Sequence, residues 1–352
     1  MTADAVGGVW RYTIDLGRAL RSRGVTFTVA VMGPAPTAAQ LEDARRAELT
    51  VVHREYRLEW MDDPWADVEL AGQWLLDLER AIQPDVIHLN GYAHASLPFS
   101  RPVLVVAHSC VRSWWHAVRN EAPPSRLHRY TGAVRTGLSA ADLVVAPTAA
   151  MMAALHEEYG ATSPGQVIPN GCSIGASGAG HLPLKEPLIL AAGRIWDDAK
   201  NIAALCAIAD RLSWPVYVAG DSCGPHGTER ALSSVRQLGQ LSAAAIDEWY
   251  RRASIYVLPA RYEPFGLSVL EAACAGCALV LGDIGSLREN WDGAAVFVRP
   301  DDHDALAASI QSFIDQPAAR GALGRAARER SAAFTIDRTA DCYVRAYESL
   351  VT

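Results

Sequence analysis

Short apolar runs, each bounded by turn residues, alternate with longer segments of helical periodicity along almost the whole chain. In the first half the clearest helical segments are 9–22 and 65–82, and each stops shortly before a glycine or a proline. The apolar runs predict strands at about 26–31, 86–89, 103–107, 143–146 and 166–168. This alternation is typical of βαβ units and a mostly parallel sheet.

The alternation breaks once and then resumes. A stretch at 173–187, rich in Gly, Ser, Ala and Pro, has no periodicity, and we expect it to be a linker. Beyond it the sequence predicts a final helix at about 336–350 and strands near 188–192, 216–219, 255–258, 279–281 and 295–298. The sequence therefore predicts two doubly wound α/β domains, 1–172 and 188–335, followed by a terminal helix.

The composition of the 352 residues fits two globular domains, with half of the residues apolar and a fifth charged. There is no apolar run of the ~18 residues that a transmembrane helix needs, and no signal-peptide pattern, so we expect a cytoplasmic location. A net charge of −7 disfavours nonspecific nucleic-acid binding. The cysteines are scattered, and Cys274-x2-Cys277 lacks a second ligand pair, so we expect neither a disulfide framework nor a metal site.

Two carboxylates lie close together in the segment 261–273, and we expect them to have different roles. Pro264 cannot continue a helix through Glu263, so Glu263 lies in a loop, whereas Glu271 lies two turns into a helix that begins near Phe265. The first backbone N–H groups of that helix lack intrahelical acceptors and suit a phosphate or a sugar oxygen; they belong to Phe265, Gly266 and Leu267.

This segment resembles the Glu-x7-Glu motif of retaining glycosyltransferases of the two-domain GT-B fold, most closely family 4. Further pieces follow in the order of that family: Gly7-Gly8, His108-Ser109, Ile168-Pro169-Asn170-Gly171, and Ala192-Gly193-Arg194 with Lys200. The resemblance implies two Rossmann-like domains that face each other across a cleft. It also implies an acceptor-side domain at 1–172, a nucleotide-sugar domain at 188–335 and a helix at 336–352 that crosses back to the first domain.

Arg194 and Lys200 follow the end of a predicted strand, where open α/β sheets bind ligands. In the family that this chain resembles, the matching side chains hold the donor diphosphate and neutralise the departing nucleotide, which fixed cations do well. Lys200 is one of only two lysines among 32 basic residues, and a compact ammonium suits a tight phosphate site. The alternative is a surface ion pair with Asp197 or Asp198, with the lysine retained by chance.

The resemblance assigns sugar hydroxyls to Glu263 and the nucleotide ribose to Glu271, because an ionised carboxylate accepts two hydroxyls well. Gly7 and Gly8 would let the backbone approach the diphosphate, although a plain turn is the alternative interpretation. His108 ends a predicted strand and would bind a sugar oxygen or assist proton movement, although a lone histidine can also be structural. The chain lacks Gly-x-Gly-x-x-Gly near Gly7, which disfavours a nicotinamide dehydrogenase.

Compared with the family, the first strand is short, because only six residues precede Gly7. The first strand of a doubly wound sheet is central, and its loss exposes strand edges. We therefore expect either a start codon upstream of Met1 or a stub of the strand at 1–5.

The segment 111–135 is strongly basic. It contains Trp114-Trp115 and a single acid, Glu121, and its arginines are Arg112, Arg119, Arg126, Arg129 and Arg135. Such a segment can rest on an anionic membrane or bind a phosphorylated lipid acceptor. The alternative is a solvated helix face with two core tryptophans.

Together, the residues and the resemblance predict a retaining hexosyltransferase-type enzyme of polysaccharide biosynthesis. It would move a sugar from a nucleotide-diphosphate donor to a glycan or lipid-linked saccharide, with an α linkage, by front-face substitution, and without a metal or cofactor. The alternatives are a nonhydrolysing sugar-nucleotide epimerase and a noncatalytic nucleotide-sugar-binding protein. Acceptor dependence separates the transferase from the epimerase, and any turnover separates an enzyme from a binder.

Overall fold

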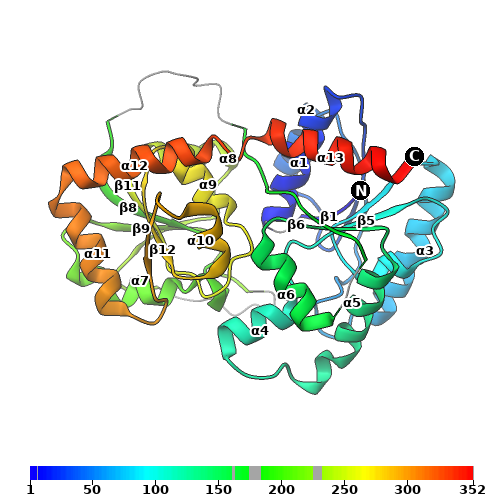
Figure 1. The fold of residues 1–352 in the computed structure, drawn as a ribbon, viewed down its shortest axis with the longest axis horizontal. Coiled ribbons are helices and arrows are strands. Elements are labelled where there is room, and N and C mark those ends of the chain that lie inside the picture. Colours follow the sequence, from blue (N-terminus) through cyan, green and yellow to red (C-terminus); the bar gives the residue numbers. More distant parts are fainter. Residues whose placement is uncertain (6, 161–162, 174–183, 225–231, 352) are drawn as a thin grey trace. The chain divides into compact units, whose positions relative to one another are not determined.

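The computed structural model describes residues 1–5, 7–160, 163–173, 184–224 and 232–351. The chain forms two compact units. Unit 1 consists of Met1–His116, Asn120–Asn170 and Ile336–Thr352, and unit 2 consists of Ala117–Arg119 and Gly171–Thr335. Each unit has parallel strands flanked by helices, as Figure 1 shows.

The strands of unit 1 form two parallel sheets. One has the order β1-β2-β3, and its strands are Thr2–Asp4, Thr28–Met32 and Thr50–Arg54. The other has the order β4-β5-β6-β7, and its strands are Ile87–Leu89, Val103–Val106, Leu143–Ala146 and Gly165–Val167. β5 and β6 are buried along their whole length, which explains why their sequences are apolar without alternation.

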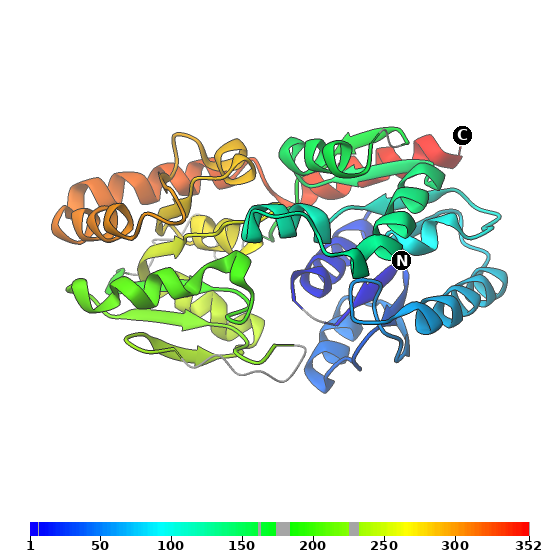
Figure 2. The ribbon, with the colours of Figure 1, turned by 90° about the horizontal axis from the view of Figure 1, so that it is seen from below.

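The α-helices of unit 1 are α1 Gly8–Arg21, α2 Ala38–Arg46, α3 Trp65–Ile82, α5 His128–Ala140, α6 Ala149–Tyr159 and α13 Ile336–Val351. Helix α4, Val111–Arg119, begins in unit 1, and its last three residues, Ala117–Arg119, belong to unit 2. The last helix, α13, is the C-terminal element and packs against α1 of unit 1. Figures 1 and 2 show it in red. Its Tyr343 and Tyr347 share a buried cluster with Tyr12 of α1, and Thr339 donates a hydrogen bond to the carbonyl of Pro169 (2.9 Å).

Unit 2 contains one six-stranded parallel sheet with the order β10-β9-β8-β11-β12-β13. In chain order, β8 to β13 span Glu186–Ala192, Val216–Ala219, Arg236–Gly239, Ala253–Leu258, Ala278–Gly282 and Val296–Val298. The helices α7 to α12 span Ile202–Ile208, Ala243–Arg252, Leu267–Cys274, Gly285–Trp291, His303–Asp315 and Pro317–Ser331. The central strand β11 is buried throughout.

The strands predicted from the sequence all form, with ends that differ by up to two residues. Two edge strands, β3 and β10, were not predicted. β3 is half-buried in its middle and exposed at both ends, and β10 is mostly exposed, so neither has the continuous apolar run of a buried strand. Most of the predicted linker at 173–187 lies outside the described residues. Its end is wrong, however, because β8 already begins at Glu186.

The short first strand that the sequence predicts is present as β1. It pairs in parallel with β2, with Thr2 opposite Ala30 and Asp4 opposite Met32. The Met1 ammonium donates to the carbonyl of Thr28 (2.9 Å), and burial lowers the pKa of this amine to about 5. β1 is thus held by backbone pairing as well as by the burial of Ala3.

Candidate active site

The candidate site in unit 2 lies beyond the carboxyl ends of β8 and β11, the edge at which parallel α/β sheets bind ligands. A short 3-10 turn, Asp198–Lys200, is tied to the loop that follows β11, because the backbone N–H of Arg261 donates to the carbonyl of Ala199 (2.8 Å). The buried amide of Asn201 donates to the carbonyls of Pro259 (2.9 Å) and Pro300 (2.8 Å). These bonds bring residue 200 next to the segment that contains Glu263.

Lys200 and Glu263, which are 63 positions apart in sequence, form an ion pair with 2.5 Å between Nζ and Oε2. Their side chains are only 15% and 12% exposed, so the pair has lost much of its hydration. The stem of Lys200 passes along Gly193, where an added Cβ would lie 3.4 Å from Lys200 Cγ. The sequence did not predict that these two side chains pair.

Glu263 also organises the start of α9. Its Oε1 accepts hydrogen bonds from the backbone N–H groups of Gly266 (3.0 Å) and Phe265 (3.4 Å). Ser286 of α10 donates to the backbone carbonyl of Glu263. The helix begins at Leu267 rather than at Phe265, after Gly266 in a left-handed conformation with φ 90°. Glu263 thus already accepts from the N–H groups of Phe265 and Gly266. The donor contacts predicted for Phe265, Gly266 and Leu267 stay predictions.

Glu271 lies in the last turn of α9 and has a phenolic partner. The hydroxyl of buried Tyr250 is hydrogen-bonded to the Glu271 carboxylate, and burial together with that negative charge raises the pKa of Tyr250 well above its usual value. The hydroxyl of Tyr256 in β11 lies 2.7 Å from Oγ of Ser268 in α9. Burial, and then the negative charges of Glu263 and Glu271, raise the pKa of Tyr256.

Arg194 forms the ion pair that the alternative interpretation predicted. Its Nη2 lies 2.9 Å from Oδ2 of Asp197, and its guanidinium lies 5.3 Å from the ring centre of Trp196. Asp197 is almost fully buried and also accepts from the backbone N–H of Ala199 (3.0 Å). The Arg194 side chain is 43% exposed, although its Nε is buried and has no hydrogen-bond partner among the residues that the structure describes.

Unit 1 contributes a separate group at the carboxyl ends of β4 and β5. His108 follows β5, and its Nε2 lies 2.8 Å from Oδ1 of Asn90, which follows β4. The amide nitrogen of Asn90 donates to the carbonyl of Thr2 (2.7 Å), which fixes the amide orientation. Burial lowers the pKa of His108 to about 4. His108 is therefore neutral at pH 7, donates from Nε2 and keeps Nδ1 as an acceptor.

The two glycines at the start of α1 lie in the same unit as His108. Gly7 is the residue before the helix and has φ 78°, a conformation that favours glycine, and Gly8 is the first helical residue. Tyr12 of α1 packs edge-on against His108, with 4.6 Å between ring centres. The positive φ supports the turn interpretation of Gly7, and the predicted approach to a diphosphate stays a prediction.

Several residues that hold the predicted site residues of the two units were not singled out as functional from the sequence. In unit 1 this is Asn90, and in unit 2 these are Asp197, Asn201, Tyr250, Arg261 and Ser286. Most of them act through backbone carbonyls or through one distant side chain. Of these residues, only Asn201 could have been noticed from the sequence, because asparagine is a preferred residue directly before the start of a helix.

Among the described residues, no group of three or more His, Cys, Asp or Glu side chains is placed to hold a metal ion. Cys277 lies beyond the end of α9, and its Sγ lies within 3.2 Å of the carbonyl oxygens of both Tyr250 and Ala253. The chain has one Asp-x-Asp spacing, Asp302-His303-Asp304. Asp302 caps α11, and Asp304 pairs with Arg211 (2.9 Å).

Many arginines of the basic segment 111–135 are held by intramolecular contacts. Arg112 lies 2.8 Å from buried Glu158. Arg126 and Arg129 stack on Trp115 (5.4 Å) and Trp65 (4.6 Å). The segment therefore presents less free positive charge than its sequence indicates, and peripheral membrane contact stays a prediction. No helix in the described ranges combines the length and apolarity needed to cross a membrane.

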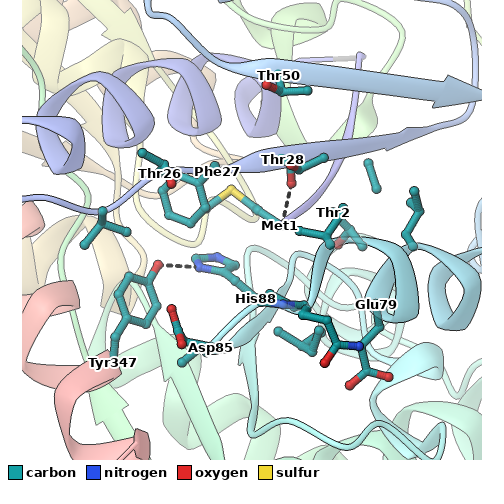
Figure 3. A pocket seen from close by; sticks show the side chains of 18 of the residues that line it. Met1, Thr2, Thr26, Phe27, Thr28, Thr50, Glu79, Asp85, His88 and Tyr347 are labelled. Carbon is teal, nitrogen blue, oxygen red and sulfur yellow. Dashed lines mark hydrogen bonds between the residues drawn. The ribbon is translucent and has the colours of Figure 1, made fainter.

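A cavity of about 700 Å³ opens in unit 1 beside Met1 and the buried His88–Tyr347 hydrogen bond (2.7 Å), as Figure 3 shows. Its wall includes the amino ends of β2 and β4, at Thr28 and Ile87. Ligands of parallel α/β sheets bind at the opposite, carboxyl ends. None of the predicted site residues lines this cavity, so we do not assign it to the donor.

Comparison with known proteins gives one family match in each half of the chain. Residues 6–175 match the model described as Glycosyltransferase Family 4, and residues 186–316 match Glycosyl transferases group 1. A D-inositol 3-phosphate glycosyltransferase of Geodermatophilus obscurus is 27% identical over 98% of this chain and 85% of its own length. A glycogen synthase of Mycobacterium tuberculosis is 43% identical over 103 residues, which are 29% of this chain and 25% of that synthase.

Solved structures share the whole fold. Sucrose-phosphate synthase from Thermosynechococcus elongatus superposes with a TM-score of 0.79 at 21% identity, covering 99% of this chain and 95% of that one. Anabaena Alr3699/HepE in complex with UDP-glucose superposes with a TM-score of 0.75 at 16% identity, covering 99% and 100%. A glycosyltransferase family model thus matches each half of the chain, and the fold is that of the GT-B glycosyltransferases.

Proposed function

We propose that this protein is a retaining glycosyltransferase, most similar to family 4, that transfers a sugar from a nucleoside diphosphate donor to a glycan or lipid-linked saccharide with an α linkage. The observation on which the proposal rests is the Lys200–Glu263 pair beside α9 and Glu271. A cation for a diphosphate and two carboxylates for polyols meet there within one unit. The proposal includes no metal and no cofactor.

Donor binding would exchange partners at Lys200. A diphosphate brings two or more negative charges and competes with Glu263 for the ammonium, while the exposed face of Arg194 supplies a second cation. The Oε2 of Glu263 then becomes an acceptor for sugar hydroxyls, while Oε1 keeps its bonds to Phe265 and Gly266. Glu271, already oriented by Tyr250, would accept the ribose hydroxyls.

In the proposed step, the bond between the anomeric carbon and the diphosphate oxygen breaks while a bond from the acceptor oxygen forms on the same face. The acceptor proton passes to the departing phosphate, so the products are an α-glycoside and a nucleoside diphosphate. Lys200 and Arg194 stabilise the charge on the leaving group. Neutral His108, held by Asn90, can accept a hydrogen bond from a sugar or acceptor hydroxyl through Nδ1.

UDP-glucose is the first donor to test, because the similar HepE structure contains it. Purified protein is incubated with UDP-glucose and other nucleotide sugars, with and without oligosaccharide acceptors, and released nucleoside diphosphate and products are measured. Lys200→Met and Glu263→Gln should each lower turnover by about 100-fold, the loss usual for a group that stabilises a transition state. Glu42→Gln, on exposed α2, is the matched control.

Three results would contradict the proposal. If both site variants keep a turnover within threefold of wild type, Lys200 and Glu263 take no part in the reaction. Acceptor-independent interconversion of the donor sugar would identify an epimerase, and binding without any turnover would identify a noncatalytic binder. Anomeric configuration, read from the NMR coupling of the product, tests retention separately.

A further inference from the structure

Two cysteines that are 102 positions apart meet in unit 2. The Sγ atoms of Cys172 and Cys274 lie 2.9 Å apart, and neither cysteine forms a disulfide in this structure. A disulfide requires about 2.05 Å between its sulfur atoms, so an adjustment of roughly 0.9 Å would join them. Both residues belong to the same compact unit, and the contact therefore does not depend on how the two units are arranged.

The backbone around Cys172 is anchored where the chain passes between the units. Its N–H donates to the carbonyl of Phe334 (3.1 Å), and it forms a parallel bridge with Thr335. The chain leaves unit 1 after Asn170 and returns to it at Ile336. Cys274 is the last residue of α9, three positions after Glu271. The thiol pair therefore lies between α9, which contains Glu271, and the two paired segments at Cys172 and Thr335 that connect unit 2 to unit 1.

The two thiols differ in their surroundings. Cys172 is 6% exposed, whereas Cys274 is half-buried and accessible in part. Hydrogen bonds from Cys172 and then Ser331 lower the pKa of Cys274, which favours its thiolate. An accessible thiolate beside a buried partner thiol is the arrangement of an attacking and a resolving cysteine.

We propose that Cys172 and Cys274 are a redox-modification site that forms a reversible intramolecular disulfide by exchange with a low-molecular-weight disulfide. The Cys274 thiolate attacks one sulfur of that oxidant and releases one thiolate, giving a mixed disulfide. Cys172 loses its proton to water and attacks Cys274 Sγ, which releases the second thiolate. Two protein thiols are oxidised, and one disulfide is reduced to two thiols. The inference is independent of the proposed function.

The disulfide would link the end of α9 to the connecting segment at Cys172 and close a loop of about 100 residues. Closing so long a loop strongly restricts the conformations of the unfolded chain. We therefore expect the oxidised protein to melt at a higher temperature than the reduced protein. If unit 2 binds a donor through Glu271, oxidation should also change donor affinity, because Glu271 lies one helical turn from the bond.

The test uses the full chain and oxidised glutathione as the probe. Reduced protein is titrated with the probe, free thiols are blocked by alkylation, and peptides are mapped by mass spectrometry without reduction. We expect a peptide pair joining residues 172 and 274, a mass lower by two hydrogens per chain, and full reversal by dithiothreitol. Cys172→Ser and Cys274→Ser should each abolish the crosslink, whereas Cys223→Ser, at an exposed site in the same unit, should retain it.

The proposal is overturned if Cys223 becomes fully glutathionylated while no 172–274 crosslink forms. It is also overturned if the oxidised protein melts at the same temperature as the reduced protein, or if the crosslink appears only after unfolding in urea. Peptide mapping of the wild-type chain does not depend on whether a serine variant folds. Loss of glycosyl transfer in Lys200→Met would leave the crosslink intact, so the two proposals fail separately.

Discussion

Asn201 provides the sharpest test of how the candidate site is assembled. Its buried side chain donates to the carbonyls of Pro259 and Pro300, and its backbone is left-handed with φ 54°. Asn201→Ala would leave one buried and one partly buried carbonyl without their donor, at about 1–3 kcal/mol for the pair after relaxation. It would also place alanine in a left-handed conformation, at about 1 kcal/mol. We expect the free energy of unfolding to fall by about 3 kcal/mol.

Two matched variants separate these contributions. Asn201→Gly loses the same hydrogen bonds without the backbone strain, so it should cost about 1 kcal/mol less than Asn201→Ala. Asn120→Ala places alanine in nearly the same conformation, φ 53°, at an exposed position, and should cost only about 1 kcal/mol. Urea unfolding followed by circular dichroism measures all three. If Asn201→Ala is no more destabilising than Asn120→Ala, the side-chain bonds do not hold these loops together.

Three further predictions follow from other contacts. Gly220→Ala should destabilise unit 2 by about 3 kcal/mol or more, because a Cβ there would lie 1.8 Å from the carbonyl oxygen of Gly193. Gly239→Ala, with open space around it, should destabilise the unit far less. Thermal melting of the two variants compares these effects. Tyr250→Phe should raise the donor KM about tenfold with little change in kcat, since it removes the hydrogen bond to Glu271, and an unchanged KM would count against the ribose assignment. Because the pKa of His108 is lowered from 6.5 to about 4 in the folded chain, the unfolded chain binds more protons between these two pH values. The free energy of unfolding should therefore fall as the pH falls through this window, and His108→Asn should make this fall less steep. If the variant shows the same dependence of the free energy of unfolding on pH, His108 is not its source.

Much of the fold could be predicted because parallel strands buried on both faces are apolar runs. β6 and β9 have the ends that their sequences indicate, whereas polar edge strands such as β10 leave no such signal. The short β1 was predicted only as a stub, since three residues are too few for a pattern.

The site could be predicted only in part. The rarity of lysine singled out Lys200, and Pro264 placed Glu263 in a loop, but neither observation indicates that the two side chains pair. The role of Asn201 depends on two proline carbonyls 58 and 99 positions away, which no local pattern contains. The start of α9 was misplaced by two residues because Glu263 and left-handed Gly266 delay the helix, a tertiary effect of one side chain on the backbone that follows it.

The Lys200–Glu263 pair also has a consequence for the end of the catalytic cycle. A site with unpaired cations would bind the nucleoside diphosphate product tightly, and dissociation of that product would then limit turnover. If Lys200 binds the donor diphosphate as proposed, the Glu263 carboxylate can pair with the Lys200 ammonium again when the nucleotide dissociates, so that these two charges are paired in the empty site. We expect such self-neutralisation to speed departure of the leaving nucleotide and to weaken inhibition by it.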